Sequence, residues 1–383
     1  MCNTKLGNFC KLHNNWRELL VEEPYCLKIK EDGDYVIFNY DQIRSDFNNS
    51  IVREARGIIF KKDEWKNPVC WAFNKFGNYG ESYVPEIDWS TAFVTEKIDG
   101  SLIKVWWDWD GGWHISTNGT IDAVKAQIQD IKVSDFGTYF CNAVEKYYGS
   151  FDEFTECLEH DFTYMFELVG PYNRVVTPYD ISDLYFLGAR NKFSGTVLNC
   201  TGINATKLGV GDVKVPESYM LTSLDECIKI AEKLTWDQEG FVVVDANDNR
   251  VKVKSPAYVK AHFARNNNVI TRKHLINVIL SNEVEEFLCY AADYKEQLDH
   301  CIGLKNTFIR LGDTFAAAGR RACGMSRRDY ASMVQCFPKI YHGLMFANYE
   351  KDCYAAEWTI DWSEDKWERY LDELERYLES LKV

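Results

Sequence analysis

The sequence has little that would place the protein in a membrane or outside the cell. No apolar segment approaches the roughly 20 residues that a helix needs to span a bilayer, and the first residues lack the apolar core of a secretory signal. None of the 13 cysteines forms a CxxC pair, which argues against a zinc ribbon or a thioredoxin motif. We therefore expect reduced, mostly buried thiols, no membrane partner and a cytoplasmic setting, that of a host cell if the chain is phage-encoded.

An excess of positive charge is also missing. Lys and Arg number 44 against 58 Asp and Glu, and the net charge is −14. This balance argues against a protein that coats nucleic acid without specificity. An enzyme that acts on nucleic acid remains compatible with it, because phosphate binding depends on local groups of basic residues.

The chain contains no repeat, low-complexity tract or Pro/Gly-rich linker that would divide it. Its 383 residues nevertheless exceed one typical domain, and the 46% of hydrophobic residues supply an ample core. The pattern changes near residue 260 from strands to helices. We predict an α+β fold: a nucleotidyltransferase-like core of antiparallel sheets with flanking helices over residues 1–262, then an all-α domain over residues 263–383.

Short runs of β-branched and aromatic residues predict the strands. They cover residues 34–40, 55–60, 93–97, 163–169 and 183–190. Two hairpins are expected, one over residues 101–117 that turns at 110–112, and one over residues 240–255 that turns at 247–249. Residues 121–149 and 223–234 are expected to be helices.

The clearest helix is predicted at the end of the chain. Ser363 is suited to be its N-cap, and Glu364 and Asp365 follow in the first turn. Apolar residues then recur at three- and four-residue spacing: Trp367, Tyr370, Leu371, Leu374, Tyr377, Leu378 and Leu381. One apolar face of this kind is typical of a helix that packs on a core.

The tetrapeptide KIDG at residues 97–100 points to chemistry, although KxDG alone would occur by chance in about one chain in ten of this length. A lysine acts as a nucleophile only after its ammonium, with an ordinary pKa of about 10.4, has lost a proton. Burial and neighbouring cations favour that loss. Basic residues suited to this role and to holding phosphates are Arg56, Lys75, Lys252 and Lys254. Lys252 and Lys254 alternate in a predicted strand and therefore share one face.

Transfer of a phosphoryl or nucleotidyl group also needs a divalent cation held by carboxylates. Glu167 and Glu239 each stand at the edge of an apolar strand. A strand-end charge in solvent explains either residue equally well when it is taken alone. The order Glu239, Gly240, an apolar strand and then KVK is much harder to ascribe to chance.

Together these segments resemble the covalent nucleotidyltransferase superfamily, which includes ATP-dependent DNA and RNA ligases and GTP-dependent mRNA capping enzymes. The matching motifs are, in order, KIDG at Lys97, FELVG at Glu167, LYFLGARN ending near Arg190, EGFVV at Glu239, and VKVKS. Upstream of them, YVIFNY, EARGIIF and NKFGN resemble the phage RNA ligase 1 family, as do FELVGPYNRVV and KVKSPAYVKAH further on. The resemblance covers residues 34–265 by motif, and the helical remainder by character only.

The resemblance implies a role for each matching residue. Lys97 would become adenylylated, with Asp99, Glu167 and Tyr258 as further catalytic residues. The nucleotide would be bound by Tyr40, Arg56, Lys75, Gly100, Glu239, Lys252 and Lys254. A metal would be held by Glu239 and by Glu285 and Glu286, which stand where the family has an aspartate pair. Asn118 departs from the family, which usually has a lysine there, and the phosphate site thereby loses a cation.

The resemblance implies an ATP-dependent RNA ligase that joins 5′-phosphate and 3′-hydroxyl RNA ends through lysyl-AMP and an adenylylated RNA end, in RNA repair. ATP would be the co-substrate and Mg²⁺, or alternatively Mn²⁺, the metal. The implied partners are RNA with such ends, nicked tRNA among them, and an end-healing kinase or phosphatase; we expect a monomer. Two alternatives stay open, an mRNA capping guanylyltransferase and a non-catalytic RNA-binding protein on the same fold.

Two groups of basic residues agree with an RNA substrate. Residues 251–273 contain six Lys and Arg and no acid. In the helical part, four arginines stand close together: Arg320, Arg321, Arg327 and Arg328. A solvated face explains the four arginines as well as phosphate contacts do.

Overall fold

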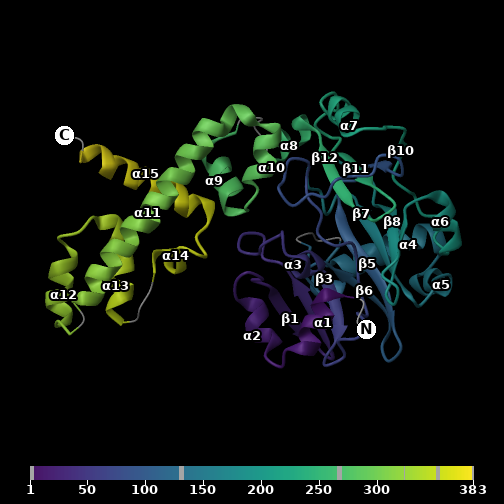
Figure 1. Cartoon of the computed structure of the whole chain (residues 1–383), viewed down its shortest axis with the longest axis horizontal. Coiled ribbons are helices and arrows are strands. Elements are labelled where there is room, and N and C mark those ends of the chain that lie inside the picture. The colour runs from purple at the N-terminus through teal and green to yellow at the C-terminus, as the bar shows by residue number, and fades with distance from the viewer. Residues whose placement is uncertain (1–3, 129–132, 265–269, 323, 351–353, 382–383) are drawn as a thin grey trace. The chain divides into compact units, whose positions relative to one another are not determined.

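Three antiparallel sheets form in the first two thirds of the chain, where alternating apolar residues predict strands (Figure 1). The computed structural model describes residues 4–128, 133–264, 270–322, 324–350 and 354–381. The chain divides into two units, Met1–His262 and Phe263–Val383, called here the N-terminal unit and the C-terminal unit.

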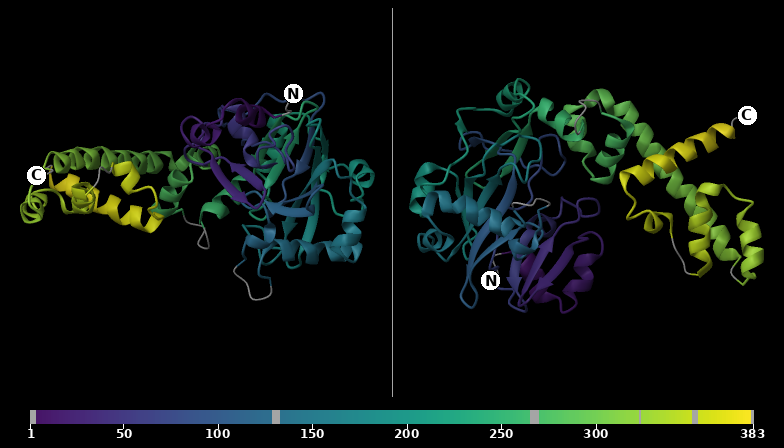
Figure 2. Two further views of the ribbon diagram at one scale, coloured as in Figure 1. Left: turned by 90° about the horizontal axis from the view of Figure 1, so that it is seen from below. Right: turned by 180° about the vertical axis from the view of Figure 1, so that it is seen from behind.

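Sheet A contains β1 (Lys28–Asp32), β2 (Tyr35–Asn39) and β3 (Arg56–Lys61), in that order. Its side chains alternate between the two faces, as strand geometry requires. Val36 and Phe38 share a buried cluster with Leu6, whereas Ile37 packs with Trp106 on the other face. The first face is covered by α1 (Lys5–Leu12), α2 (Trp16–Val21) and α3 (Ser50–Glu54), the first two of which Figure 2 shows in purple from two further directions.

Sheet C has the order β6 (Gly112–Thr117), β5 (Ser101–Asp108), β7 (Phe162–Val169), β8 (Asp183–Asn191) and β9 (Val197–Asn199). One face carries α4 (Phe136–Tyr148), α5 (Phe151–Glu156) and α6 (Gly202–Lys207). Phe140 of α4 and Phe154 of α5 pack with Phe166 and Phe186 of the sheet. Burial of these large rings holds the helices on that face and leaves the strand ends available for a site.

Sheet B has the order β10 (Ser218–Tyr219), β4 (Phe93–Glu96), β11 (Gly240–Val244) and β12 (Arg250–Lys254). Helix α7 (Leu224–Ala231) covers one face, where Cys227 and Ala231 pack with Phe241 and Val243. Helix α8 (Pro256–Ala264) follows β12 directly. The residues on the other face of sheet B are therefore free to line a cavity.

The expected helix over residues 121–149 is wrong in its first half. Among the described residues of that half, the helical structure is a 3₁₀ turn, η1 (Ala123–Lys125), and α4 begins at Phe136. Asp122 and Asp135 each cap a new start: the Asp135 carboxylate accepts a hydrogen bond from the Thr138 amide at 2.7 Å. A side chain that binds the backbone in this way ends one segment and begins another. Residues 129–132 lie outside the described residues.

The C-terminal unit is helical within the described residues, as predicted. Its elements are α9 (Arg272–Leu280), α10 (Val284–Tyr290), η2 (Ala292–Tyr294), α11 (Lys295–Arg321), α12 (Arg327–Val334), η3 (Lys339–Tyr341), α13 (His342–Glu350), α14 (Ala355–Trp358) and α15 (Glu364–Ser380). Ser363 caps α15 as expected, since its hydroxyl accepts a hydrogen bond from the Lys366 amide. Trp367 and Leu371 of that helix pack around Phe308 and Tyr341.

The described residues also show whether any helix could span a membrane and how the cysteines are placed. No helix in the described ranges combines the length and apolar character needed to cross a membrane. The cysteines that the structure describes are free thiols and most of them are buried.

Gly240 offers a test of the strand arrangement. Its φ is +134°, and a Cβ there would lie 2.1 Å from the carbonyl oxygen of Val253. We expect Gly240→Ala to lower the free energy of unfolding by about 2–4 kcal/mol, because it adds backbone strain and a clash within sheet B. Urea denaturation measures the change. Gly119→Ala is the control, because a Cβ at Gly119 has no atom within 4 Å. Equal denaturation midpoints for the two variants would contradict the close packing of Gly240 against β12.

Candidate active site

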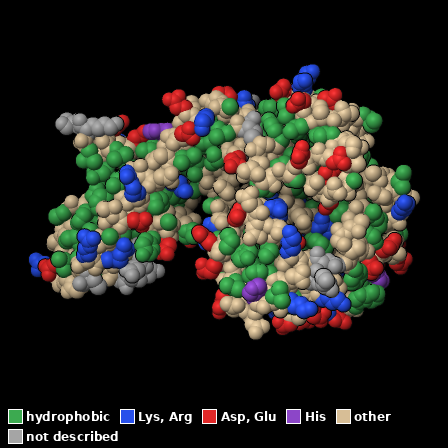
Figure 3. Space-filling view, viewed as in Figure 1, with side chains coloured by type: hydrophobic (Ala, Val, Ile, Leu, Met, Phe, Trp, Pro, Cys, Tyr) green, Lys and Arg blue, Asp and Glu red, His purple; other side chains and the backbone are tan. Residues whose placement is uncertain are grey.

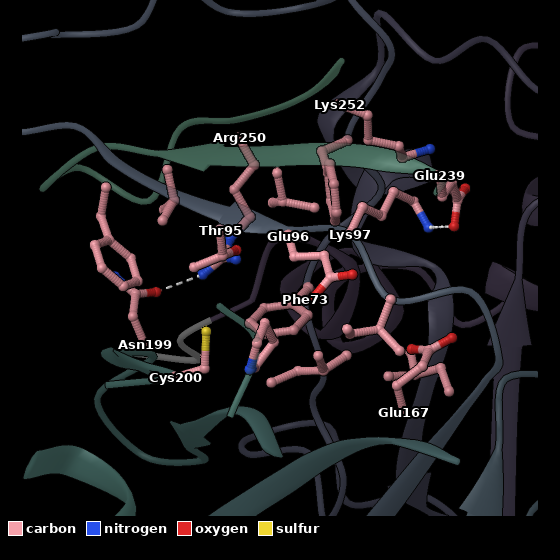
Figure 4. Close-up of a pocket in the computed structure, with 18 of the residues that line it drawn as sticks. Phe73, Thr95, Glu96, Lys97, Glu167, Asn199, Cys200, Glu239, Arg250 and Lys252 are labelled. Carbon is pink, nitrogen blue, oxygen red and sulfur yellow. Dashed lines mark hydrogen bonds and ion pairs between the residues drawn. The ribbon is translucent and has the colours of Figure 1, made fainter. Parts of the chain in front are cut away.

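A cavity, called here the first cavity, is lined by residues of all three sheets (Figure 4). Its charged residues are Arg56, Glu96, Lys97, Glu167, Glu239, Arg250, Lys252 and Lys254. Apolar wall residues include Phe73, Phe76, Phe93, Leu102 and Leu187. In the view of Figure 4, Lys97 and Glu239 lie at one end, and Asn199 and Cys200 at the other, with Phe73 between them. The cavity thus combines a charged end with an end suited to a flat apolar ring.

Lys97 is held at the charged end by its backbone and by its side chain. The Lys97 amide donates to the Gly240 carbonyl at 2.8 Å, which extends the pairing of β4 with β11. Its Nζ donates to Oε2 of Glu239 at 2.7 Å, and Lys254 Nζ lies 3.6 Å from the other oxygen. The Glu239 side chain is only 4% exposed, against 22% for Lys97. A buried carboxylate therefore directs the amine into the cavity.

Asp99 is turned away from the cavity, although the resemblance implies a catalytic role. Its Oδ2 accepts hydrogen bonds from the amides of Val176 at 2.9 Å and Thr177 at 2.7 Å. Its Oδ1 accepts from the hydroxyl of buried Tyr258 at 2.8 Å. Asp99 and Tyr258 thus fix the turn after Lys97. Gly100 completes the turn, because a Cβ there would lie 2.5 Å from the Leu168 carbonyl.

Glu167 of β7 lies in the wall of the first cavity and has an unusual acidity. Burial raises the pKa of its carboxyl to about 7, the positive charge of Lys97 opposes this rise, and the charge of Glu239 adds to it. The carboxyl therefore takes up a proton at a higher pH than an exposed glutamate does. When protonated, it both donates and accepts hydrogen bonds, for instance with the hydroxyls of a sugar.

Arg56, Lys252 and Lys254 are brought together on the same cavity, as predicted. The Arg56 guanidinium lies 5.3 Å from the centre of the Phe76 ring, and its Nη1 is buried without a hydrogen-bond partner. Lys252 Nζ lies 5.3 Å from the same ring. Ring faces hold cations without neutralising them, so this wall keeps positive charge for a ligand.

Three residues of the first cavity were missed by the sequence reasoning. Arg250 precedes Lys252 by two positions, and the period of a strand could have found it. It donates to Asn199 Oδ1 at 2.8 Å and to Asp248 Oδ1 at 2.7 Å. Asn199 carried no signal in the sequence. Glu96, which matches no motif in the sequence, also lines the cavity; burial and then the charge of Glu217 raise its pKa.

Lys75 and Tyr40 lie together but outside the wall of the first cavity. Lys75 Nζ lies 5.3 Å from the centre of the Tyr40 ring and 5.0 Å from that of Phe47. Lys75 lines a neighbouring cavity, called here the second cavity, which shares Phe76 and Arg250 with the first. The structure therefore places Lys75 next to the first cavity and not in its wall. Its role in nucleotide binding stays a prediction.

The expected metal residues are distributed over both units of the chain. Glu239 lies in the first cavity, and Glu285 is exposed on α10 of the C-terminal unit. The side chain of Glu286 lies outside what the structure describes. Within the described ranges, no three His, Cys, Asp or Glu side chains form a metal-binding group. Glu285 and Glu286 remain predictions.

This arrangement is suited to the transfer of a phosphate-linked group. A primary amine faces a cavity, a buried carboxylate accepts its hydrogen bond, and cations on two strands, β3 and β12, line the same cavity. Such cations stabilise the charge that develops on a phosphate during substitution.

Comparisons with known proteins agree with this chemistry. A family model described as RNA ligase matches residues 54–258. A protein of Autographa californica nuclear polyhedrosis virus, described as a bifunctional polynucleotide kinase/RNA ligase, is 28% identical over 304 residues, which are 75% of this chain and 42% of that protein. This chain thus spans less than half the length of that viral relative.

Two further proteins are similar. An RNA ligase of Rhodothermus phage RM378 is 26% identical over 316 residues, covering 68% of this chain and 70% of the phage protein. Among solved structures, an archaeal ATP-dependent RNA ligase superposes with a TM-score of 0.44 and 13% identity, over 75% of this chain and 74% of that one.

The raised pKa of Glu167 predicts a pH dependence of stability. Between about pH 4.5 and 7 the folded protein binds more protons here than the unfolded chain, so this carboxyl lowers stability as the pH rises through that window. We expect Glu167→Gln to be more stabilising at pH 8 than at pH 5, measured as free energies of unfolding in urea. Glu232→Gln, on the exposed end of α7, is the control. A Glu167→Gln effect independent of pH would refute the raised pKa.

Proposed function

Because the chain belongs to the RNA ligase family, whose model matches residues 54–258 of its 383, we propose that it is an ATP-dependent RNA ligase acting through a lysyl-AMP intermediate. The observation that carries this proposal is the Lys97 amine, held 2.7 Å from the buried Glu239 carboxylate inside a cavity with Arg56, Lys252 and Lys254. A merely structural lysine has no need of such surroundings.

The reaction proceeds in three substitutions at phosphorus. The Lys97 amine forms a bond to the α-phosphorus of ATP, pyrophosphate leaves, and the proton of the amine passes to an oxygen such as that of Glu239. An oxygen of the RNA 5′-phosphate then attacks the AMP phosphorus and the P–N bond breaks. Finally the 3′-hydroxyl attacks the RNA phosphorus, releases AMP and closes the strand.

Each end of the first cavity binds a different part of the nucleotide. The cations beside Lys97 bind the phosphates, and Phe73 with the polar Asn199 end receives the base. Glu167, whose carboxyl has a raised pKa and lines the same cavity, is assigned to the ribose hydroxyls. Asp99 and Tyr258 act indirectly, because their hydrogen bond holds the turn that presents Lys97.

A divalent cation fits the charged end. Mg²⁺ commonly binds one or two protein carboxylates together with substrate phosphates, and Glu239 with Glu167 offers such a pair. When bound, the cation neutralises charge on the triphosphate. Mn²⁺ fits the same oxygen ligands.

Labelling with nucleotide tests the proposal. We expect incubation with Mg²⁺ and α-labelled ATP to leave label on the denatured protein. Lys97→Ala should abolish this labelling, because the Lys97 amine is the group that forms the phosphoramidate bond to AMP. Lys254→Ala is expected to retain slow labelling. Intact mass is measured first, since purified protein carrying AMP would block the reaction.

The same experiment separates the alternatives. Labelling by GTP in place of ATP would indicate an mRNA capping guanylyltransferase. Absence of labelling by either nucleotide, with protein shown to be free of AMP, would leave a non-catalytic RNA-binding protein.

The C-terminal unit supplies a surface for the RNA strand. Residues 305–349 contain seven Lys and Arg and two acids, in a chain of net charge −14. Figure 3 shows Lys and Arg side chains over α11 to α13. Exposed members of this group are Arg310, Arg321, Arg327, Arg328 and Lys339. Arg310, Arg321, Arg328 and Lys339 form no ion pair with another described residue. Arg310 and Arg321 are three turns apart on one face of α11, about 16 Å, a distance that spans several phosphates.

Together with the resemblance to the phage RNA ligase 1 family, this surface supports a broken tRNA as the proposed substrate. Where a break leaves a 5′-hydroxyl or a 3′-phosphate, a kinase or a phosphatase must first convert these ends, so an end-healing enzyme is the proposed partner. The relative from the nuclear polyhedrosis virus is described as a bifunctional enzyme with both a polynucleotide kinase and an RNA ligase.

Charge removal tests the RNA surface. The triple variant Arg310→Gln, Arg321→Gln, Arg328→Gln is expected to bind RNA more weakly and to lower the slope of log affinity against log salt by about 2, at about 0.7 per lost phosphate contact. Labelling by ATP should stay unchanged. Arg369→Gln with Arg376→Gln, on acidic α15, is the control. Equal salt slopes for wild type and triple variant would exclude this surface.

A further inference from the structure

A third cavity, of about 540 Å³, lies within the C-terminal unit. It is bounded by the start of α9, by η2 and by the first turns of α11, and α9, α11 and α15 pack on one another (Figure 1). Its wall contains the aliphatic side chains of Ile270 and Leu275, the ring of Tyr294, and polar side chains that include Arg272 and Gln297. A mainly apolar wall with a few polar groups is typical of a site for a small organic ligand or ring.

Arg272 lines this cavity with its charge already balanced. Its Nη1 donates to Oε2 of Glu375 at 2.8 Å and lies 3.0 Å from Oδ1 of Asp372. The His300 ring hydrogen-bonds the other oxygen of Glu375, also at 2.8 Å. Two carboxylates beside one guanidinium oppose the binding of a further anion. A phosphate is therefore a poor ligand here, and a neutral group with acceptor atoms is favoured.

The second edge of the same guanidinium still has donors to offer. Its Nε and Nη2 atoms are buried, and within the part of the chain that the structure describes neither has a hydrogen-bond partner. The thiol of Cys301, a weak acceptor, is close by: burial raises its pKa and the charge of Arg272 opposes the rise. Because the guanidinium is a rigid planar fork, Nε–H and Nη2–H point the same way. They suit two adjacent acceptors on one ligand.

Tyr294 supplies a ring that is held in place beside these donors. Fully buried Phe287 packs against it edge to face, with the ring centres 6.2 Å apart. Tyr294 itself is only partly buried, so a face of its ring is available to the cavity that it lines. Bases of single-stranded RNA stack on aromatic side chains of this kind. The wall therefore suits a flat aromatic ligand.

We propose that the third cavity binds an unpaired guanine base of the RNA strand. Guanine presents two adjacent acceptors, O6 and N7, and an arginine contacts both through two parallel N–H groups. Arg272 would read this edge while the base stacks on Tyr294. Adenine has an amino group in place of O6, and that group cannot accept from the same donor. The inference rests on the proposed function, because it takes RNA as the substrate, and it adds the base that this unit selects.

Equilibrium binding in the absence of ATP tests the pocket. The probes are single-stranded RNAs of uridine that carry guanine, 7-deazaguanine or adenine at the same regular intervals; 7-deazaguanine has carbon in place of N7. Arg272→Lys keeps the charge beside Glu375 and removes the paired donors. Tyr294→Leu removes the ring face and keeps an apolar group. Arg369→Lys, exposed on α15, makes the same change elsewhere as the control.

We expect the wild type and Arg369→Lys to bind the guanine strand about tenfold more tightly than the adenine strand, and to lose most of that preference with 7-deazaguanine. Arg272→Lys should bind all three strands with nearly equal affinity. Tyr294→Leu should weaken the guanine strand about fivefold or more through lost stacking.

Equal affinities of the wild type for guanine and adenine strands would overturn the proposal, as would a preference that survives 7-deazaguanine or Arg272→Lys. The 7-deazaguanine strand probes the contact on unaltered protein, so the result does not depend on how a variant folds. Failure of the lysyl-AMP chemistry would appear separately, as absent labelling of the wild type by ATP, while these affinities would still decide the pocket.

Discussion

The buried carboxylate of Glu239 is the constraint around which the first cavity is organised. A carboxylate that is 4% exposed is stable only when it is paired, and Lys97 and Lys254 provide the pairing. Because Lys97 follows β4, Glu239 precedes β11 and Lys254 ends β12, one charge connects three neighbouring strands of sheet B. The same contact that stabilises the strand ends also directs an amine into the cavity, so folding and chemistry depend on one interaction.

The remaining cations follow a different rule, which explains how the site stays positive in an acidic protein. Arg56, Lys75 and Lys252 each lie over an aromatic ring. A ring face attracts a cation without cancelling its charge. Phe76 does this for both Arg56 and Lys252 and also separates the two cavities. The aromatic residues between the sheets are therefore part of the electrostatics as well as of the core.

The parts of the site that lie on strands could be predicted from the sequence, because alternate residues of a strand share one face. Lys252 and Lys254 follow from alternation, and the family match confirms the resemblance built on ordered motifs. Positions set by loops could not be predicted: Lys75 lies in a segment without regular structure, and only the folded chain shows that it faces the second cavity. The expected helix over residues 121–149 failed for a related reason, since two capping aspartates interrupt it and periodicity does not register caps.

Asn118 shows how a departure from the family pattern is accommodated. Its Oδ1 is buried without a partner, so the missing lysine has not been replaced by another ion pair at that position. The ammonium group of Lys104 is close to this position. Lys104 lies on β5, which pairs with β6, and β6 ends just before Asn118. Lys104 is fully buried and donates to the Gly57 carbonyl, and burial lowers its pKa, as does the charge of Arg56. Since Gly57 follows Arg56 directly, this buried lysine fixes the start of β3 and with it the arginine that faces the first cavity. This part of the chain therefore has no cation at position 118. Lys104 instead supplies an ammonium that hydrogen-bonds the backbone of sheet A at Gly57.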